Sequence, residues 1–155
     1  MESRKDIGNA RNLAGLPGVF VHVAQLGPEA NKYGLTEQAL RSDVELQLRQ
    51  NGVKVFLEQE ITCVTRWPEL YIIINLLIWA EEKEPSVVSV SISVRRDVLI
   101  EEDPILRAVG IIWERGYVAD DISWNLKQAR AKVESFVDEF INDYLKANPK
   151  QKCRK

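Results

Sequence analysis

The sequence predicts a single α+β domain: an antiparallel sheet of about five strands packed on one face by two helices, in the order β-α-β-β-β-β-α. Three observations predict it. Segments 36–50 and 122–147 carry apolar residues at spacings of three and four, as amphipathic helices do. Segment 88–95 alternates strictly between aliphatic and polar residues, as a half-buried strand does. Several strand-like segments follow one another with no helix between them, which favours antiparallel pairing.

Length and composition indicate how the chain is divided. It has 155 residues, of which 45% are hydrophobic and 28% charged, values typical of one globular core. We expect a flexible leader over 1–15, the domain over 16–149 and a basic tail over 150–155. The net charge of −2 gives no broad attraction for nucleic acid, which is therefore not an expected partner.

The sequence also bears on compartment. No apolar stretch is long enough to span a membrane. The opening residues are charged and lack the apolar region of a secretory signal. As given, the chain is therefore expected in the cytoplasm, or in the periplasm or outside the cell if a signal has been removed.

The first elements are a strand, a helix and a second strand. Aliphatic residues alternate over 19–24, which indicates a strand. Thr36 suits the N-cap of the helix that follows, and the Asn51-Gly52 pair suits its end. Apolar residues recur every four positions on one face of this helix, at Leu40, Val44 and Leu48. Segment 53–57 then reads as a short strand.

Three further strands follow, joined by a loop and by charged turns. Segment 58–69 reads mostly as a loop. Segment 70–80 is apolar on both faces, as expected of a strand in the middle of a sheet. The alternating strand 88–95 comes next, and then the strand 107–114.

The longest predicted element is the helix 122–147. Asp120 and Asp121 are expected to cap its start, and Pro149 follows its end. The apolar stripe of this helix consists of Leu126, Ala129, Val133, Phe136, Val137, Phe140 and Tyr144. We expect this helix to cover the sheet.

Residues that carry chemistry are few. His22 is the only histidine, so it is the one candidate for a catalytic imidazole, although a partly exposed side chain is the simpler interpretation. The chain has no GxSxG, GxGxxG or GxxxxGK[ST] motif. A ligand, such as an anion, would find hydroxyl and guanidinium donors on one face of strand 88–95, at Ser89, Ser91, Ser93 and Arg95. An ordinary solvated sheet face is the alternative.

No metal site and no cofactor are expected. Cys63 and Cys153 form no CxxC pair, and one histidine does not complete a four-ligand zinc site. The acidic clusters at 81–84 and 101–103 lie beside prolines and lack the spacing of a calcium loop. They read as solvated turns.

Two apolar residues fall outside the apolar stripe of the last helix. Trp124 and Ile141 are therefore expected to be exposed. Together with a free sheet edge, they indicate a surface that pairs with a protein partner or with another copy of the chain.

Parts of the sequence resemble a family of uncharacterised bacterial proteins. The resemblance rests on segments 16–19 and 34–37, on VELQLRQNGV at 44–53 and on VDEFINDYLKANPK at 137–150. Members of that family often carry a secretory signal, which this sequence lacks. The element order is also similar to small periplasmic lipoprotein domains of envelope assembly and to the amino-terminal domain of the Tol translocation protein. Those likenesses imply a binding or scaffolding module associated with the envelope.

Two functions remain open at this point. The first is a non-enzymatic binding or assembly module that uses a sheet edge or a helix surface. The second is an enzyme or a small-ligand-binding protein that uses His22 or the face of Ser89, Ser91, Ser93 and Arg95. A deep pocket that holds His22 with a carboxylate within hydrogen-bond reach favours the second, and a flat surface favours the first.

Overall fold

The computed structural model describes residues 10–60, 68–80 and 83–150. Its class is α+β, as predicted. The helices and strands are β1 (Phe20–Val23), α1 (Pro28–Lys32), α2 (Glu37–Gln50), β2 (Glu69–Leu77), β3 (Ser86–Ile100), β4 (Asp103–Val118) and α3 (Leu126–Ala147). Two 3-10 turns, η2 (Ala10–Leu13) and η3 (Glu58–Glu60), complete the described elements.

The sheet is mixed and has four strands in the order β1-β2-β3-β4. β1 runs parallel to β2, whereas β2, β3 and β4 pair antiparallel. The prediction of a purely antiparallel sheet of about five strands was therefore wrong in detail. Segment 53–57 makes one isolated bridge, Val19 to Val55, instead of a strand. Because α2 carries the chain from β1 back to the start of β2, the two strands must run in the same direction.

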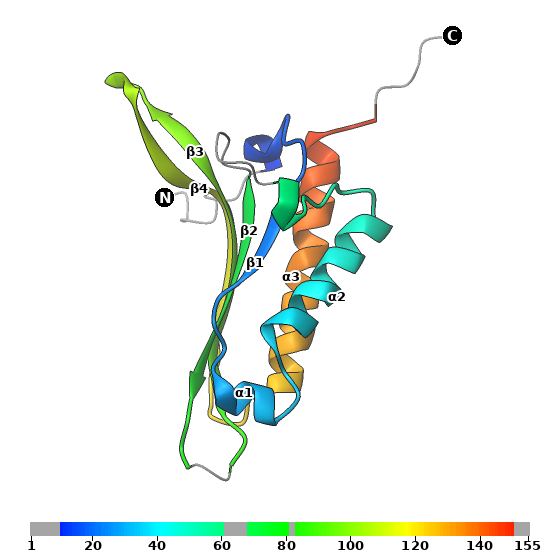
Figure 1. The fold of residues 1–155 in the computed structure, drawn as a ribbon, viewed down its shortest axis with the longest axis vertical. Coiled ribbons are helices and arrows are strands. Elements are labelled where there is room, and N and C mark those ends of the chain that lie inside the picture. The colour runs from blue at the N-terminus through cyan, green and yellow to red at the C-terminus, as the bar shows by residue number, and fades with distance from the viewer. Residues whose placement is uncertain (1–9, 61–67, 81–82, 151–155) are drawn as a thin grey trace.

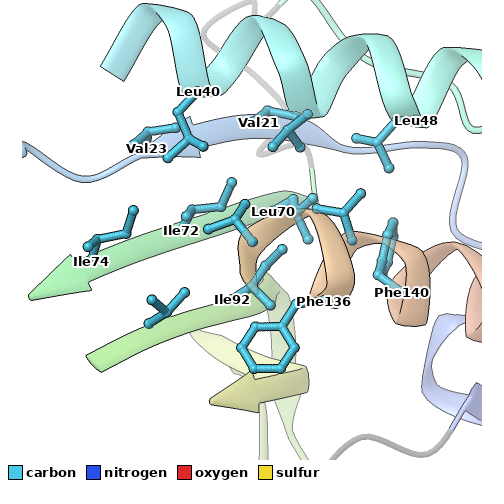
Figure 2. Close-up of a cluster of buried hydrophobic side chains, with 14 of the residues drawn as sticks. Val21, Val23, Leu40, Leu48, Leu70, Ile72, Ile74, Ile92, Phe136 and Phe140 are labelled. Atoms are coloured by element: carbon cyan, nitrogen blue, oxygen red, sulfur yellow. The ribbon is translucent and has the colours of Figure 1, made fainter. Parts of the chain in front are cut away.

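The helices α2 and α3 lie on one side of the sheet, and Figure 1 shows the other side without a helix. Alternate strand residues point toward the helices and are buried, as at Val21, Leu70, Ile72 and Ile92. Leu40 of α2 and Phe140 of α3 close over them (Figure 2). The core therefore forms between the two layers and leaves the second sheet face outside it.

Local capping explains where the two long helices begin. Thr36 caps α2 as predicted, because its Oγ1 accepts a hydrogen bond of 3.0 Å from the backbone N–H of Ala39. The predicted cap of α3 was wrong, because the helix starts at Leu126 after Asn125. Asn125 and Gln128 bond each other's backbone N–H groups in a capping box.

The aspartates expected at that cap lie before the helix. Asp121 accepts a hydrogen bond of 2.7 Å from the backbone N–H of Ser123, which shapes the turn that leads into α3. The preference of Asp for both caps and turns explains the error, since the same side chain satisfies backbone donors in either setting.

β3 and β4 are longer than predicted, with 15 and 16 residues. Beyond Arg95 they leave the rest of the sheet and continue as a two-stranded ribbon that ends in the acidic turn at Glu101 and Glu102 (Figure 1). The alternation of aliphatic and polar residues ends at Arg95, because two further polar residues, Arg96 and Asp97, follow it. Neither face of the ribbon is buried, so its strands need no alternating pattern, and the sequence pattern therefore did not indicate their full length.

The ordered domain also begins before Leu16. Leu13 of η2 is completely buried, and Asn148 donates a hydrogen bond of 2.8 Å to its carbonyl oxygen. The Asn148 side chain also accepts from the backbone N–H of Gly15 at 2.8 Å. The end of α3 thus fixes residues that were expected in a flexible leader. Residues 1–9, and all but Lys150 of the predicted basic tail, lie outside the described residues.

Candidate functional site

The face of the sheet that the helices leave open carries most of the predicted site residues. Register places His22, Tyr71, Ser93 and Glu114 side by side across the four strands. Glu69 and Arg95 form the neighbouring row on β2 and β3. We call this set the outer sheet surface: His22, Glu69, Tyr71, Ser93, Arg95 and Glu114.

His22 has a carboxylate partner but no nucleophile beside it. Its Nδ1 forms a hydrogen-bonded pair with Glu69, and its ring meets the Tyr71 ring edge-on at 4.9 Å. Ser93 is two strands away, about 10 Å at the usual strand spacing, and Tyr71 lies between. Ser93 is also buried, with 7% of its surface exposed. This geometry does not form a Ser-His-acid arrangement.

The space beside His22 is a shallow hollow along the edge of β1. Its volume is about 300 Å³, and its walls include Phe20, Arg41 and Glu58. His22 keeps 49% of its side-chain surface exposed. A site at which catalysis excludes water would enclose the imidazole instead.

Arg95 lies flat against Tyr71 at the centre of the outer sheet surface. The guanidinium carbon is 3.9 Å from the ring centroid, which is a close cation–π contact. The Nε atom of Arg95 is buried and has no hydrogen-bond partner among the described residues. Stacking on Tyr71 therefore holds the guanidinium in place.

The serine row does not form an open donor surface. Ser93 is buried, and Ser89 accepts a hydrogen bond of 2.8 Å from the side-chain amide of Asn75. Ser91 lies between them, opposite Ile73 and Gly116. The structure thus brings the predicted residues together on one face, but the Ser89 hydroxyl already bonds Asn75 and the Ser93 side chain is buried within the sheet.

The ribbon adds apolar residues that sequence reasoning missed. We call them the ribbon surface: Leu99, Ile105, Val109 and Ile111, whose exposed fractions are 62%, 91%, 55% and 46%. Cross-strand register pairs Ile111 with Arg95, and Val109 with Asp97, so the ribbon surface continues the outer sheet surface. Leu99 and Ile105 lie outside the predicted strands, whereas Val109 and Ile111 lie within the predicted strand 107–114. The register shift between Val94 and Arg95 puts Ile111 on the face away from the buried Trp113.

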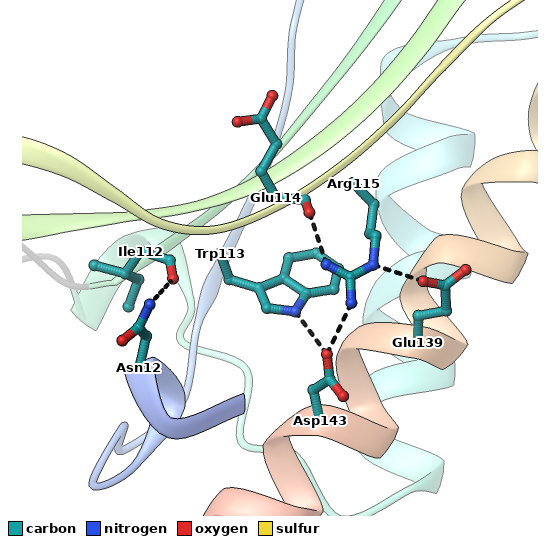
Figure 3. A network of polar contacts seen from close by, with 7 residues as sticks. All are labelled: Asn12, Ile112, Trp113, Glu114, Arg115, Glu139 and Asp143. Carbon is teal, nitrogen blue, oxygen red and sulfur yellow. Dashed lines mark hydrogen bonds and ion pairs between the residues drawn. The ribbon is translucent and has the colours of Figure 1, made fainter. Parts of the chain in front are cut away.

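A polar network fixes the base of the ribbon on the helix side of the sheet (Figure 3). Trp113 is completely buried, and its Nε1 donates to Asp143 of α3 at 2.9 Å. Arg115 donates to the same carboxylate at 3.1 Å and to Glu139 at 2.7 Å. The ribbon therefore projects from an anchored strand.

Two backbone carbonyls of β4 are also occupied at this point. The side-chain amide of Asn12 donates to Ile112 O at 2.9 Å, and Arg115 donates to Glu114 O at 2.9 Å. β4 is an edge strand, so these contacts leave fewer of its backbone groups free to pair with another strand.

Trp124 and Ile141, which were expected to be exposed for a partner, are half-buried and buried. Ile141 is buried, with 3% of its surface exposed, so its predicted exposure was wrong. α3 contacts α2 and η2 as well as the sheet, and its buried arc is therefore wider than one stripe. Trp124 is half-buried and stacks on Tyr117 with ring centroids 4.7 Å apart.

A second hollow lies between the outer sides of α2 and α3, with a volume of about 510 Å³. Leu40 and Val44 contribute apolar lining. An ion pair between Asp43 and Arg130 bridges the two helices here. Leu46 is 56% exposed at this hollow and offers a control position far from the ribbon.

Three pKa shifts accompany the packing around α3. Burial raises the pKa of Tyr144. Hydrogen bonds from the Ser123 hydroxyl and backbone lower the pKa of Asp121. Desolvation and the neighbouring Asp120 carboxylate raise the pKa of Tyr117. Tyr117 belongs to β4, Asp121 to the turn before α3 and Tyr144 to α3, so all three groups lie outside the outer sheet surface.

No family model matches the chain, and no curated protein matches it. The outer sheet surface and the ribbon surface must therefore be interpreted from their own geometry.

Within 10–60, 68–80 and 83–150, no three His, Cys, Asp or Glu side chains are grouped to hold a metal ion. No helix in these ranges has both the length and the apolar character needed to cross a membrane. Cys63 and Cys153 lie outside the described residues.

Proposed function

We propose that this protein is a non-enzymatic binding or assembly module that engages a protein partner through the ribbon surface. The observation that carries the proposal is the exposure of Leu99, Val109 and Ile111 on one face of a projecting ribbon. Contiguous exposed aliphatic residues on an anchored element are typical of protein interaction sites. Full burial of an exposed aliphatic side chain of this size against a partner contributes about 1.5–3 kcal/mol to the free energy of binding.

The neighbouring outer sheet surface supports the same proposal. Tyr and Arg are enriched at protein interfaces, because both combine large contact area with hydrogen-bonding groups. Tyr71 and Arg95 are already held against each other, at 3.9 Å, and so lose little side-chain entropy on binding. Acidic residues at the ribbon turn, Glu101, Glu102 and Asp103, disfavour an anionic membrane as the partner.

A small-ligand site at His22 is the second candidate. The pairing of His22 with Glu69 beside a hollow of about 300 Å³ favours it. The exposure of the imidazole, whose side chain keeps 49% of its surface open to solvent, and the distance to Ser93, two strands away, weigh against it. The two candidates make opposite predictions for variants of the ribbon and of His22.

We expect the double variant Leu99→Glu with Val109→Lys to lose its partner. Leu99 lies opposite Arg107 and Val109 opposite Asp97, so each new charge meets an opposite charge and the fold should be retained. Capture after chemical crosslinking, from cells that express the chain, should fall at least about tenfold, because two apolar contacts become charged. The family resemblance directs this search to envelope fractions as well as to the cytoplasm.

Two matched variants complete the capture experiment. Leu46→Glu places a charge at an equally exposed aliphatic residue on α2 and should leave capture unchanged. His22→Ala should also leave it unchanged. Loss of the partner with His22→Ala, together with full capture by the ribbon variant, would contradict the proposal and favour the second candidate.

A further inference from the structure

The free edge of β4 is interrupted at two places, which leave a short window between them. At Ile112 the carbonyl oxygen is taken by the Asn12 amide, at 2.9 Å. Toward the ribbon turn, register slips between Leu99 and Ile100, so the regular ladder with β3 resumes only at Arg107. Edge strands attract other strands wherever they are regular and unblocked. With respect to residues 10–60, 68–80 and 83–150, that condition holds for five residues, Arg107 to Ile111.

We propose that a second copy of this chain pairs with the window 107–111, antiparallel and across a two-fold axis at Val109. The inference rests on the proposed function, because it names the partner of the ribbon surface. In a two-fold antiparallel pair, the central residue must face itself and every other residue must meet its mirror position. Val109 is the centre of the window, and 55% of its surface is exposed.

The window is complementary to itself in this register. Val109 meets Val109 of the second copy, a β-branched apolar pair that suits adjacent strands. Arg107 meets Ile111 of the second copy, and Ala108 meets Gly110. No like charges lie directly opposite each other, so the pairing meets no direct cross-strand repulsion.

Small side chains near the axis agree with a close approach of two copies. Ala108 and Gly110 are small, and a Cβ at Gly110 would make a tight contact, 3.0 Å, with a methyl group of Val98 in the same chain. Charges of both signs lie near the axis: Asp97 of β3 lies opposite Val109, whereas Arg95 and Arg96 lie opposite Ile111 and Gly110. The arginines outnumber the aspartate, so charge repulsion contributes to a weak association of two copies.

The resulting sheet would join two sheets of four strands edge to edge. Five paired residues span about 17 Å, so the interface lies at the small end of specific interfaces and should be weak. We therefore expect a dimer that dissociates on dilution, with a dissociation constant of about 10 µM to 1 mM.

Sedimentation equilibrium of the purified full chain, over that concentration range, tests the inference. Wild type should shift from monomer to dimer as concentration rises. Val109→Lys alone and Val109→Glu alone should each weaken the dimer at least about tenfold, because like charges then face each other at the axis. An equimolar mixture of the two variants should restore it, since only the mixture pairs opposite charges.

Ile111→Glu gives an independent test of register. The new glutamate faces Arg107 of the second copy, so the dissociation constant of the dimer should fall about threefold instead of rising. Leu46→Lys is the control on α2 and should change nothing. Circular dichroism should show that every variant keeps the wild-type fold.

The outcomes separate this inference from the proposed function. A wild-type chain that stays monomeric at about 1 mM, or a mixture that does not restore the dimer, overturns self-pairing alone. The proposed function survives that result if Leu99→Glu with Val109→Lys still abolishes capture of another protein. If the same variant captures that protein as well as wild type does, the proposed function fails too.

Discussion

Trp113→Ala is expected to lower the free energy of unfolding by about 4 kcal/mol, because it removes the largest completely buried side chain among the described residues. The indole ring packs edge-on against Phe140 at 5.4 Å, and its Nε1 donates to Asp143 at 2.9 Å. Truncation leaves a cavity between β4 and α3 at the base of the ribbon. Urea unfolding followed by far-UV circular dichroism measures the change.

Trp113→Phe is the matched control. It keeps an aromatic ring in the core and removes the N–H donor. Asp143 still accepts a hydrogen bond of 3.1 Å from Arg115, so its carboxylate is not left without a partner. We expect a smaller loss, about 1–2 kcal/mol. A loss for the alanine variant no larger than that for the phenylalanine variant would contradict the anchoring role of Trp113.

Gly18→Ala is expected to cost about 2–3 kcal/mol, because a Cβ at this position has no space. It would lie 2.5 Å from Lys54 O and 2.9 Å from Lys54 Cβ, and the first of these is backbone. Lys54 O also accepts the 2.9 Å hydrogen bond from Val19 N–H. The substitution therefore pushes the chain after α2 away from the start of β1.

Gly116→Ala is the comparison for this variant. The nearest atoms to a Cβ there are 3.9 Å away, which is ordinary van der Waals contact. Urea unfolding should show a change within about 0.5 kcal/mol. Similar losses at Gly18 and Gly116 would show that close packing at Lys54 is not the cause.

Local signals in the sequence predicted α2 well. A capping threonine and apolar residues at every fourth position depend only on near neighbours, and the structure shows Thr36 at the cap and Leu40, Val44 and Leu48 buried. The direction of β1 depends on contacts with β2, about fifty residues away. Segment 53–57 has a strand-like pattern, but its pairing is limited to the isolated bridge between Val19 and Val55, because strand pairing depends on distant partners more than on local propensity.

The candidate site was predictable only where it depends on local sequence patterns. Alternation correctly put Ser89, Ser91, Ser93 and Arg95 on one face, and β1 brings His22 to that face. The Glu69 and Tyr71 partners arise from pairing between strands that a single sequence does not reveal. Leu99 and Ile105 of the ribbon surface were missed because strand length beyond the core leaves no alternating pattern. The exposed face of Val109 and Ile111 was missed because it depends on the register shift between β3 and β4. The burial of Ile141 was missed because α3 packs against neighbours on several sides.

Amide hydrogen exchange of the chain, alone and with its captured partner or at high concentration, tests the central claim most directly. If the protein acts by contact through the ribbon, amides of β4 within 107–111 should exchange more slowly in the bound state, while those around His22 should not change. Protection that appears along β1 beside His22, with the ribbon unaffected, would contradict the claim.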